Sequence, residues 1–298
     1  MRQEPPHVKG RPNSDVVVPR IIARDITGRP RDGFIIDFGT EMSEADAAEF
    51  ASPFAHVQER VQAVRANNRD KFSREHWWLH QRPRPEMRQA VAPLGRFIVT
   101  PRHSKHRVFV WQEHPTLADS ATSVVARDDH YAFGVLTSRS HELWSLRLCT
   151  WLGVGNDPRY TPTTTFETFP FPFPWPLNTP DDALTPEQRK YRDAIGAAAK
   201  ELDDKRRLWL NPPEWVREVP DVIPSLPNRL LSVDDGAAEQ LKRRTLTNLY
   251  NQRPTWLDNL HRSLDAAVFA AYGWPANIED EHILERLLTL NLERVAGQ

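Results

Sequence analysis

The spacing of hydrophobic and polar positions divides the chain into three parts. Residues 1–33 are polar and carry Gly and Pro at short intervals, which is typical of turns and not of a folded domain. The apolar run at residues 34–38 then predicts a buried strand. Ser43 and Ser52 are expected to begin two helices, because a serine hydroxyl at an N-cap satisfies free backbone N–H groups.

The period of the hydrophobic residues changes after Pro85. A helix is expected from Ser138 to about Trp151, since leucines recur on one side of it. Short apolar runs separated by turn residues predict four strands, at residues 96–100, 107–111, 122–126 and 131–135.

A domain boundary is expected at Pro170-Phe-Pro-Phe-Pro-Trp-Pro176, because alternating proline and aromatic residues exclude a helix and favour an extended path. Thr185-Pro-Glu-Gln188 then carries the signals of a helix start. After a proline-rich loop at 211–235, further helices are expected over 237–252, 254–272 and 279–294.

These patterns predict an α+β fold in which a strand-containing domain precedes a mainly helical one. The expected divisions are a linker at 1–33, the strand-containing domain at 34–176 and the helical domain at 177–298.

Composition narrows the class of protein. The 298 residues have a mean hydropathy of −0.60, and no apolar run reaches the length of a membrane helix. The N-terminal sequence lacks the apolar core of a secretion signal, so a cytoplasmic location is expected. The single Cys149 excludes an internal disulfide framework and any metal site built from cysteines alone.

The net charge of −1 hides a strong asymmetry. Residues 51–110 hold 12 Lys and Arg against 4 Asp and Glu, whereas residues 176–298 hold 16 against 20. A basic middle region favours contact with a polyanion. Arginine outnumbers lysine by 32 to 7, which suits bidentate contacts to phosphate and guanine, although a GC-rich genome would produce the same bias.

Several short motifs do not carry the chemistry that they suggest. Asn211-Pro-Pro-Glu214 resembles the tetrapeptide with which amino-methyltransferases hold a flipped base, but Glu replaces the required aromatic residue and the motif follows a helix. Asp37-Phe-Gly39 lacks a phosphate loop, and Gly153-Val-Gly155 lacks the third glycine of a dinucleotide fingerprint. The pairs His76/His80 and His103/His106 have aromatic or cationic neighbours, so no metal is expected.

Two segments have the composition of a nucleic-acid contact. Thr100-Pro-Arg-His-Ser-Lys-His-Arg107 joins two predicted strands, so Arg102, Lys105 and Arg107 are expected at a hairpin tip. Ser138-Arg-Ser-His-Glu-Leu-Trp144 opens a predicted helix whose free N–H groups, beside Arg139, would attract a phosphate.

The order of these motifs resembles a known enzyme family. Residues 8–176 resemble the target-recognition region of MmeI-like type II DNA methyltransferases, and residues 185–298 resemble their C-terminal helical region. The stretches that carry the resemblance are Gly10–Asp15, Trp77–His80, Arg96–Arg102, Lys105–Trp111, Ser138–Trp144, Arg159–Pro172 and Thr245–Asn251.

The resemblance implies sequence-specific recognition of double-stranded DNA within a restriction-modification system. Such enzymes transfer a methyl group from S-adenosylmethionine to adenine. This chain shows no glycine-rich cofactor loop and no Asn-Pro-Pro-aromatic motif, so we expect it to hold neither catalytic nor cofactor residues and to act with a separate or missing catalytic domain, for which 1–33 would be a remnant linker. The residues expected at the DNA are Arg102, Lys105, Arg107, Arg139 and Arg159, with Tyr160, Thr163 and Thr164 as lesser candidates.

Two alternatives remain open at this stage. The chain could be a complete enzyme, either a methyltransferase with a degenerate cofactor site or a nuclease. It could also be a decayed fragment that acts as an interaction scaffold, for which the Pro/aromatic segment 170–176 would supply the binding surface.

Overall fold

The computed structural model describes residues 1–4, 11–152, 157–173, 183–224 and 226–296. Its centre is an antiparallel sheet in the order β4-β3-β6, in which Ile98 pairs with Trp111 on one side and with Val125 on the other. Ile98 and Val99 are fully buried, so both faces of the central strand are covered. The strands are β3 (Arg96–Pro101), β4 (Val110–Glu113) and β6 (Thr122–Val125), which confirms three of the four predicted strands.

The fourth predicted strand is wrong, because residues 131–135 lie in helix α7 (His130–Thr137). The Asp129 carboxylate caps this helix by accepting from the Ala132 N–H at 2.8 Å. Every residue from Tyr131 to Thr137 is buried. A helix buried on all sides shows no polar face, and a short apolar run of this kind reads equally well as a strand.

The N-terminal segment contributes regular structure of its own. Strand β1 (Val17–Ile21) pairs in antiparallel register with β2 (Phe34–Ile36) and in parallel with β5 (Leu117–Ala118). The short helices η1 (Asn13–Asp15) and α1 (Ala23–Thr27) flank β1. The run at 34–38 is thus a strand as predicted, although β2 is only half-buried, and its neighbour β1 comes from the segment predicted to be a linker.

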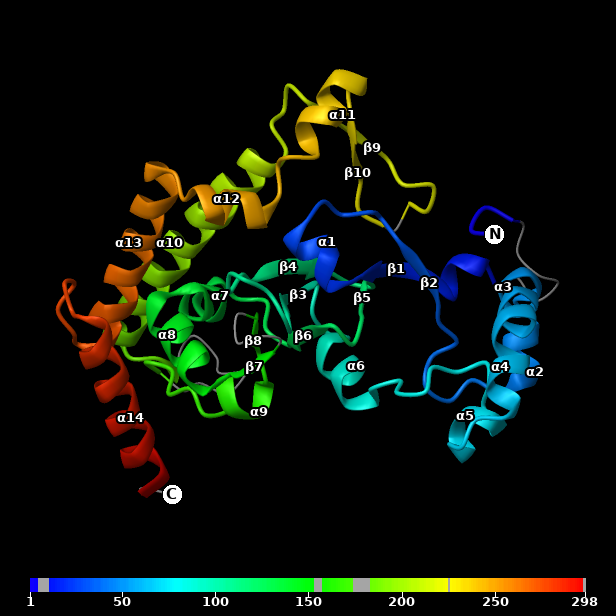
Figure 1. The fold of residues 1–298 in the computed structure, drawn as a ribbon, viewed down its shortest axis with the longest axis horizontal. Helices are drawn as coiled ribbons and strands as arrows, with labels where there is room; N and C mark the ends of the chain where they lie inside the picture. The colour runs from blue at the N-terminus through cyan, green and yellow to red at the C-terminus, as the bar shows by residue number, and fades with distance from the viewer. Residues whose placement is uncertain (5–10, 153–156, 174–182, 225, 297–298) are drawn as a thin grey trace.

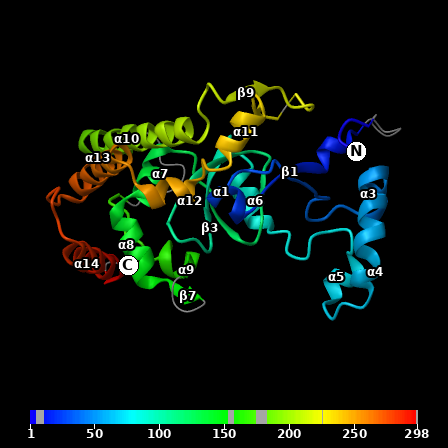
Figure 2. The same ribbon diagram turned by 45° about the horizontal axis from the view of Figure 1, so that its top comes forward.

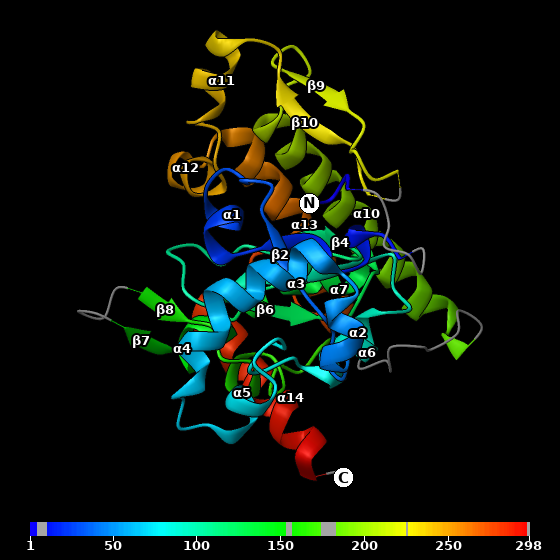
Figure 3. The same cartoon turned by 90° about the vertical axis from the view of Figure 1, so that its right-hand side faces the viewer.

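A group of short helices forms a second, smaller core beside β1 and β2 (Figures 1 and 3). Phe38 and Phe50 lie at its centre, each about 1% exposed. Ser43 caps the first of these helices through the Asp46 N–H at 3.1 Å, as predicted. The helix start predicted at Ser52 is wrong, because α3 begins at Ala51 and Phe50 occupies its N-cap. The helices are α2 (Glu44–Ala48), α3 (Ala51–Val57), the π-helical segment η2 (Gln58–Gln62), α4 (Ala63–Ala66) and α5 (Lys71–Glu75).

Further short elements precede and follow the central sheet along the chain, as far as residue 173. Helix α8 begins after Ser138, as predicted, and ends at Leu148, where a β-hairpin follows. The elements are α6 (Pro85–Val91), α8 (Arg139–Leu148), β7 (Thr150–Leu152), β8 (Asp157–Arg159) and α9 (Pro162–Thr165). The last three residues of the predicted boundary segment, from residue 174 to 176, lie outside the described residues.

The C-terminal part is mainly helical, as predicted. Helix α10 (Pro186–Leu210) begins with the expected capping box, in which Thr185 and Gln188 each accept from the other's backbone N–H. Figures 1 and 2 show α10 and α13 side by side. The later helices are α11 (Asp235–Leu241), α12 (Leu246–Gln252), α13 (Thr255–Tyr272) and α14 (Asp280–Ala296).

The predicted loop at 211–235 is partly wrong, because it contains a β-hairpin. Strands β9 (Val216–Val219) and β10 (Arg229–Ser232) pair in antiparallel register and project with α11 at one end of the molecule (Figure 3). The proline-rich segment between the two strands conceals the pairing, and neither strand has a fully buried residue that would mark an inner face.

One large hydrophobic core joins the central sheet to the C-terminal helices. Helix α10 packs on α7 so closely that a Cβ on Gly134 would lie 2.7 Å from the Ile195 Cγ2 atom. The architecture is α+β, as predicted. Residues on both sides of the expected division at residue 176/177 contribute to this shared core, and its status as a domain boundary stays a prediction. No helix in the described part of the chain is long and apolar enough to cross a membrane.

Candidate nucleic-acid interface

Arg102 lies where strand β3 ends, held between two neighbouring segments. Its backbone N–H donates to the Ala121 carbonyl at 2.8 Å, and its carbonyl accepts from the Tyr160 N–H at 2.7 Å. The guanidinium Nε donates to the Thr122 carbonyl at 3.2 Å. The side chain therefore leaves the sheet edge from a fixed backbone and is only half-buried.

Arg159 is brought to the same place from the β7–β8 hairpin. Its backbone forms an antiparallel bridge with His103, next to Arg102. Burial, followed by the charges of Arg159 and Arg84, lowers the pKa of Arg102. Among the described residues no carboxylate forms an ion pair with any of these three guanidinium groups. We call Arg84, Arg102 and Arg159 the arginine cluster, and its mutual repulsion favours an external anion.

Arg107 is buried at the base of the loop that joins β3 to β4, with 8% exposure. Its guanidinium donates to the Pro101 carbonyl at 2.6 Å, to Thr100 Oγ1 at 3.2 Å and to the Pro158 carbonyl at 3.4 Å. Burial lowers its pKa to about 10, so the group stays charged at neutral pH. Arg107 therefore ties the loop to the β7–β8 hairpin.

Lys105 lies at the exposed tip of this loop and reaches a C-terminal helix. Its Nζ donates to the Asn251 Oδ1 atom at 2.7 Å, and His106 Nε2 lies 2.9 Å from the same oxygen. Ser104 donates to the His106 carbonyl at 2.7 Å, which closes the turn. The loop is therefore held on α12 by two polar contacts to a single side chain.

Tyr160 is a core residue, with 1% exposure. Its hydroxyl lies 3.1 Å from His141 Nε2, and His141 Nδ1 lies 2.9 Å from the Leu136 carbonyl. Burial lowers the pKa of His141 to about 3, so the ring is neutral. Its Nδ1–H donates to the Leu136 carbonyl, and its Nε2 accepts a hydrogen bond from the Tyr160 hydroxyl. Thr163 and Thr164 follow in α9 and are exposed.

Arg139 lies at the start of α8, where an internal carboxylate already fills the expected anion position. Its backbone N–H donates to Asp265 Oδ1 at 2.8 Å, and its guanidinium pairs with Asp280 at 2.5 Å. A phosphate at this helix end would have to displace the Asp265 carboxylate.

Residues 41–173 match the family model described as "MmeI, target recognition domain". This segment is similar to the target recognition domain of MmeI. All eight residues predicted at the DNA lie within this matched segment, whereas Asn251, which anchors its loop, lies outside it.

The structural comparison extends the likeness beyond the target recognition domain. A solved structure of the Type IIL restriction-modification enzyme MmeI in complex with DNA matches 95% of this chain with a TM-score of 0.62 and 16% identity. The match covers 32% of the MmeI chain, so this chain spans about a third of that protein's length. At this identity the likeness concerns the fold. No curated protein matches the sequence.

The structure divides the eight predicted residues into three groups. Arg102 and Arg159 share the arginine cluster, and the exposed Thr163 and Thr164 continue the same chain segment. Arg107 and Tyr160 are buried and support this surface from below, while Lys105 and Arg139 lie toward the C-terminal helices. The DNA contacts themselves stay a prediction.

Sequence reasoning missed Arg84, which lies outside both motifs. The only local signal is its position between Pro83 and Pro85, and its nearness to Arg102 depends on the fold. Asn251 was missed for the same reason.

The motifs to which the sequence assigned no chemistry have side chains that contact other residues of the fold. The Asn211 Oδ1 atom accepts from Arg29 at 2.9 Å, and Asp37 receives two bonds from Arg88. His76 stacks on Phe72 with 4.7 Å between ring centroids. The described residues contain no group of three His, Cys, Asp or Glu side chains that could hold a metal. Gly153-Val-Gly155 lies outside the described residues.

Proposed function

We propose that this chain recognises a specific sequence in double-stranded DNA as the C-terminal part of an adenine-specific DNA methyltransferase of a restriction-modification system. The observation that carries the proposal is the arginine cluster, which has no ion-pair partner among the described residues and lies inside a segment that matches the MmeI target recognition domain.

The arrangement suits a duplex in two respects. Arg159 bridges by its backbone to His103, next to Arg102, and the positive charges of Arg102 and Arg159 are close enough to interact, so both can serve phosphates of one strand. Thr163 adds an exposed hydroxyl group that can donate or accept toward phosphates or base edges, and the exposed Thr164, whose hydroxyl donates to the Thr161 carbonyl at 3.3 Å, can still accept. Loops held on rigid strands are common positions for such contacts.

S-adenosylmethionine and the methyl transfer belong, in this proposal, to a catalytic domain outside these 298 residues, on the same polypeptide or on a separate subunit. The one Asn-Pro-Pro sequence of the chain does not fit the catalytic role, because Asn211 is engaged by Arg29 and Pro212 is buried. We therefore assign DNA recognition, and not the methyl transfer, to this chain.

DNA binding by the purified chain tests the proposal. A duplex selected from a randomised pool should bind with an affinity that falls as salt rises, and the combined change Arg102→Ala and Arg159→Ala should flatten the slope of log K against log salt by about 2. Arg286→Ala on α14 is a matched control, because it removes an exposed arginine outside the cluster. Equal salt slopes in the double variant and the control would contradict the proposed interface.

A cofactor titration separates the proposal from a complete methyltransferase. We expect no heat when S-adenosylmethionine is added to the chain alone, and no radiolabel on plasmid DNA incubated with both. Saturable heat together with labelled plasmid would show that the chain is itself an enzyme.

A further inference from the structure

A cavity lined by several arginines shares Arg84 with the arginine cluster. It measures about 270 Å³ and lies between strand β1, the turn before α6 and the turn between β5 and β6. Arg20, Arg82, Arg84 and Arg88 line it, and Asp119 is the one carboxylate among its lining residues. Burial raises the pKa of Asp119, while the charges of Arg20 and Arg102 act in the opposite direction, so this single carboxylate offsets only part of the positive charge around the cavity.

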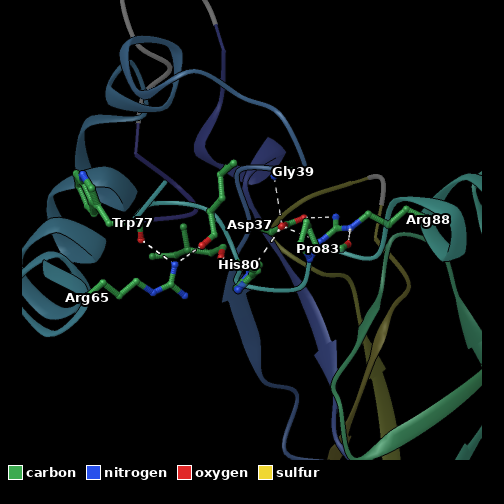
Figure 4. A network of polar contacts seen from close by, with 9 residues as sticks. Asp37, Gly39, Arg65, Trp77, His80, Pro83 and Arg88 are labelled. Carbon is green, nitrogen blue, oxygen red and sulfur yellow. Dashed lines mark hydrogen bonds and ion pairs between the residues drawn. The ribbon is translucent and has the colours of Figure 1, made fainter. Parts of the chain in front are cut away.

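Arg88 acts as a brace of this cavity and not as a free cation. Its guanidinium donates to both Asp37 carboxylate oxygens, at 2.6 and 3.0 Å, and its Nε donates to the Pro83 carbonyl at 2.5 Å (Figure 4). The ion pair neutralises Arg88 and fixes the turn at Pro83. The surplus positive charge therefore belongs to the other three arginines.

Arg84 is held in a strained backbone conformation by this turn. Its φ of 56° and ψ of 60° place it in the left-handed region, between two prolines. A non-glycine residue is uncommon there, and such strain is concentrated at binding and switch positions. The side chain is exposed, and no ion pair or hydrogen bond involves it within the described residues.

Neither of the other two arginines makes an ion pair among the described residues, although Arg20 interacts electrostatically with Asp119. Arg82 is exposed and makes no ion pair among the described residues. Arg20 has a buried Nε atom without a hydrogen-bond partner, an arrangement that costs free energy unless a ligand satisfies it. Three cations thus surround a space that continues the arginine cluster toward β1.

We propose that this cavity binds a backbone phosphate of the DNA, with Arg84 as the principal contact and Arg20 and Arg82 as supporting cations. The inference rests on the proposed function, which it extends by one phosphodiester group beyond Arg102 and Arg159. A guanidinium group can donate two parallel N–H bonds to one phosphate group, which it matches in charge and geometry. We therefore identify the ligand as a phosphodiester of the DNA backbone.

The substitution Arg84→Gly tests this proposal without adding strain, because glycine adopts positive φ freely. We expect its affinity for duplex DNA to fall about five- to tenfold, since it removes one charge-assisted contact. The salt slope should fall by about 0.9, and the thermal midpoint should equal or exceed that of the wild type. Arg84→Lys should restore most of the slope, and Arg286→Ala is the control.

A phosphate contact also predicts how specificity responds. Because phosphates carry no sequence information, Arg84→Gly should weaken the selected duplex and a random duplex by the same factor. Arg82→Ala, at an exposed position, should lower the salt slope in the same direction and does not depend on how Arg84→Gly folds.

Four outcomes would overturn the inference. If Arg84→Gly and Arg82→Ala bind DNA like the wild type while the Arg102/Arg159 double variant is weakened, the cavity lies outside the interface although the proposed function stands. A loss confined to one base pair would mean base contact instead. Saturable binding of inorganic phosphate that is lost in Arg84→Gly, with DNA binding intact, would assign the cavity to a small anion. Failure of the wild type to bind DNA would end both proposals.

Discussion

Buried charged residues fix the geometry of the exposed ones in this protein. Arg107 satisfies two backbone carbonyls and a threonine hydroxyl from inside the fold, and one of those carbonyls belongs to the β7–β8 hairpin. The positions of Arg102 and Arg159 therefore depend on a residue that itself has almost no contact with solvent.

Arg107→Met should destabilise the chain by about 2–4 kcal/mol, because it leaves buried carbonyl groups without donors. Chemical denaturation measures the free energy of unfolding. Lys105→Met, in the same loop but exposed, is the matched control and should stay within about 0.5 kcal/mol of the wild type. Similar losses in both variants would contradict the bracing role of Arg107.

Asp265 makes stability depend on pH. Burial raises its pKa to about 6, and the groups around it are Arg139, Glu142 and Arg253. The folded state therefore binds a proton more tightly than the unfolded chain, so stability falls as pH rises from about 4 to about 6 and is then constant.

Asp265→Asn should weaken this fall and stabilise the protein above pH 6 by about 1–3 kcal/mol, since the amide oxygen can still accept from the Arg139 N–H. Thermal unfolding between pH 4 and pH 8 measures the effect. A variant whose midpoint follows the wild-type pH curve would show that Asp265 carries no such penalty.

At the residue level, sequence predicted which segments carry the charges but not which side chains face solvent. Arg102 and Arg107 have the same local pattern, and only the packing of Pro158 and Tyr160 against the loop separates an exposed arginine from a buried one. The nearness of Arg84 to Arg102 depends on the pairing of distant strands, which no local pattern contains.

At the level of elements, two helix caps could be predicted from the sequence, whereas the burial of whole elements could not. Ser43 and Thr185 begin their helices as predicted, because the cap is formed within four residues. The strand predicted at 131–135 failed because α7 is surrounded on all sides. The hairpin within 211–235 was missed because its two strands are separated by a long proline-rich segment.

Two helical glycines in the contact between α7 and α10 give a matched test of this packing. Gly134→Ala should cost about 1–3 kcal/mol, because its Cβ would lie 2.7 Å from Ile195 and 2.9 Å from Ala199. Gly196→Ala should be neutral or stabilising, since its Cβ would meet His130 at an ordinary 3.6 Å and alanine favours helix. Thermal unfolding that ranks the two variants in the opposite order would contradict the close packing.

Considered as a whole, the molecule shares one core across the expected boundary near residue 176. Helix α7 comes from the target recognition domain and packs on α10 from the C-terminal part. A chain that ends at residue 176 should therefore lose its fixed tertiary packing, because Phe133 and its neighbours would be uncovered. Near-UV circular dichroism and the sharpness of thermal unfolding measure this. A truncated chain that unfolds cooperatively would establish 34–176 as an independent domain.

The contact between Asn251 and the loop tip has a consequence for hybrid proteins. A chimaera that exchanges only the segment matched to the family model would import a foreign loop and retain the host's α12. Lys105 and His106 would then meet a side chain selected for another loop. A chimaera between relatives of this chain should therefore exchange the residue at position 251 together with the loop that contacts it.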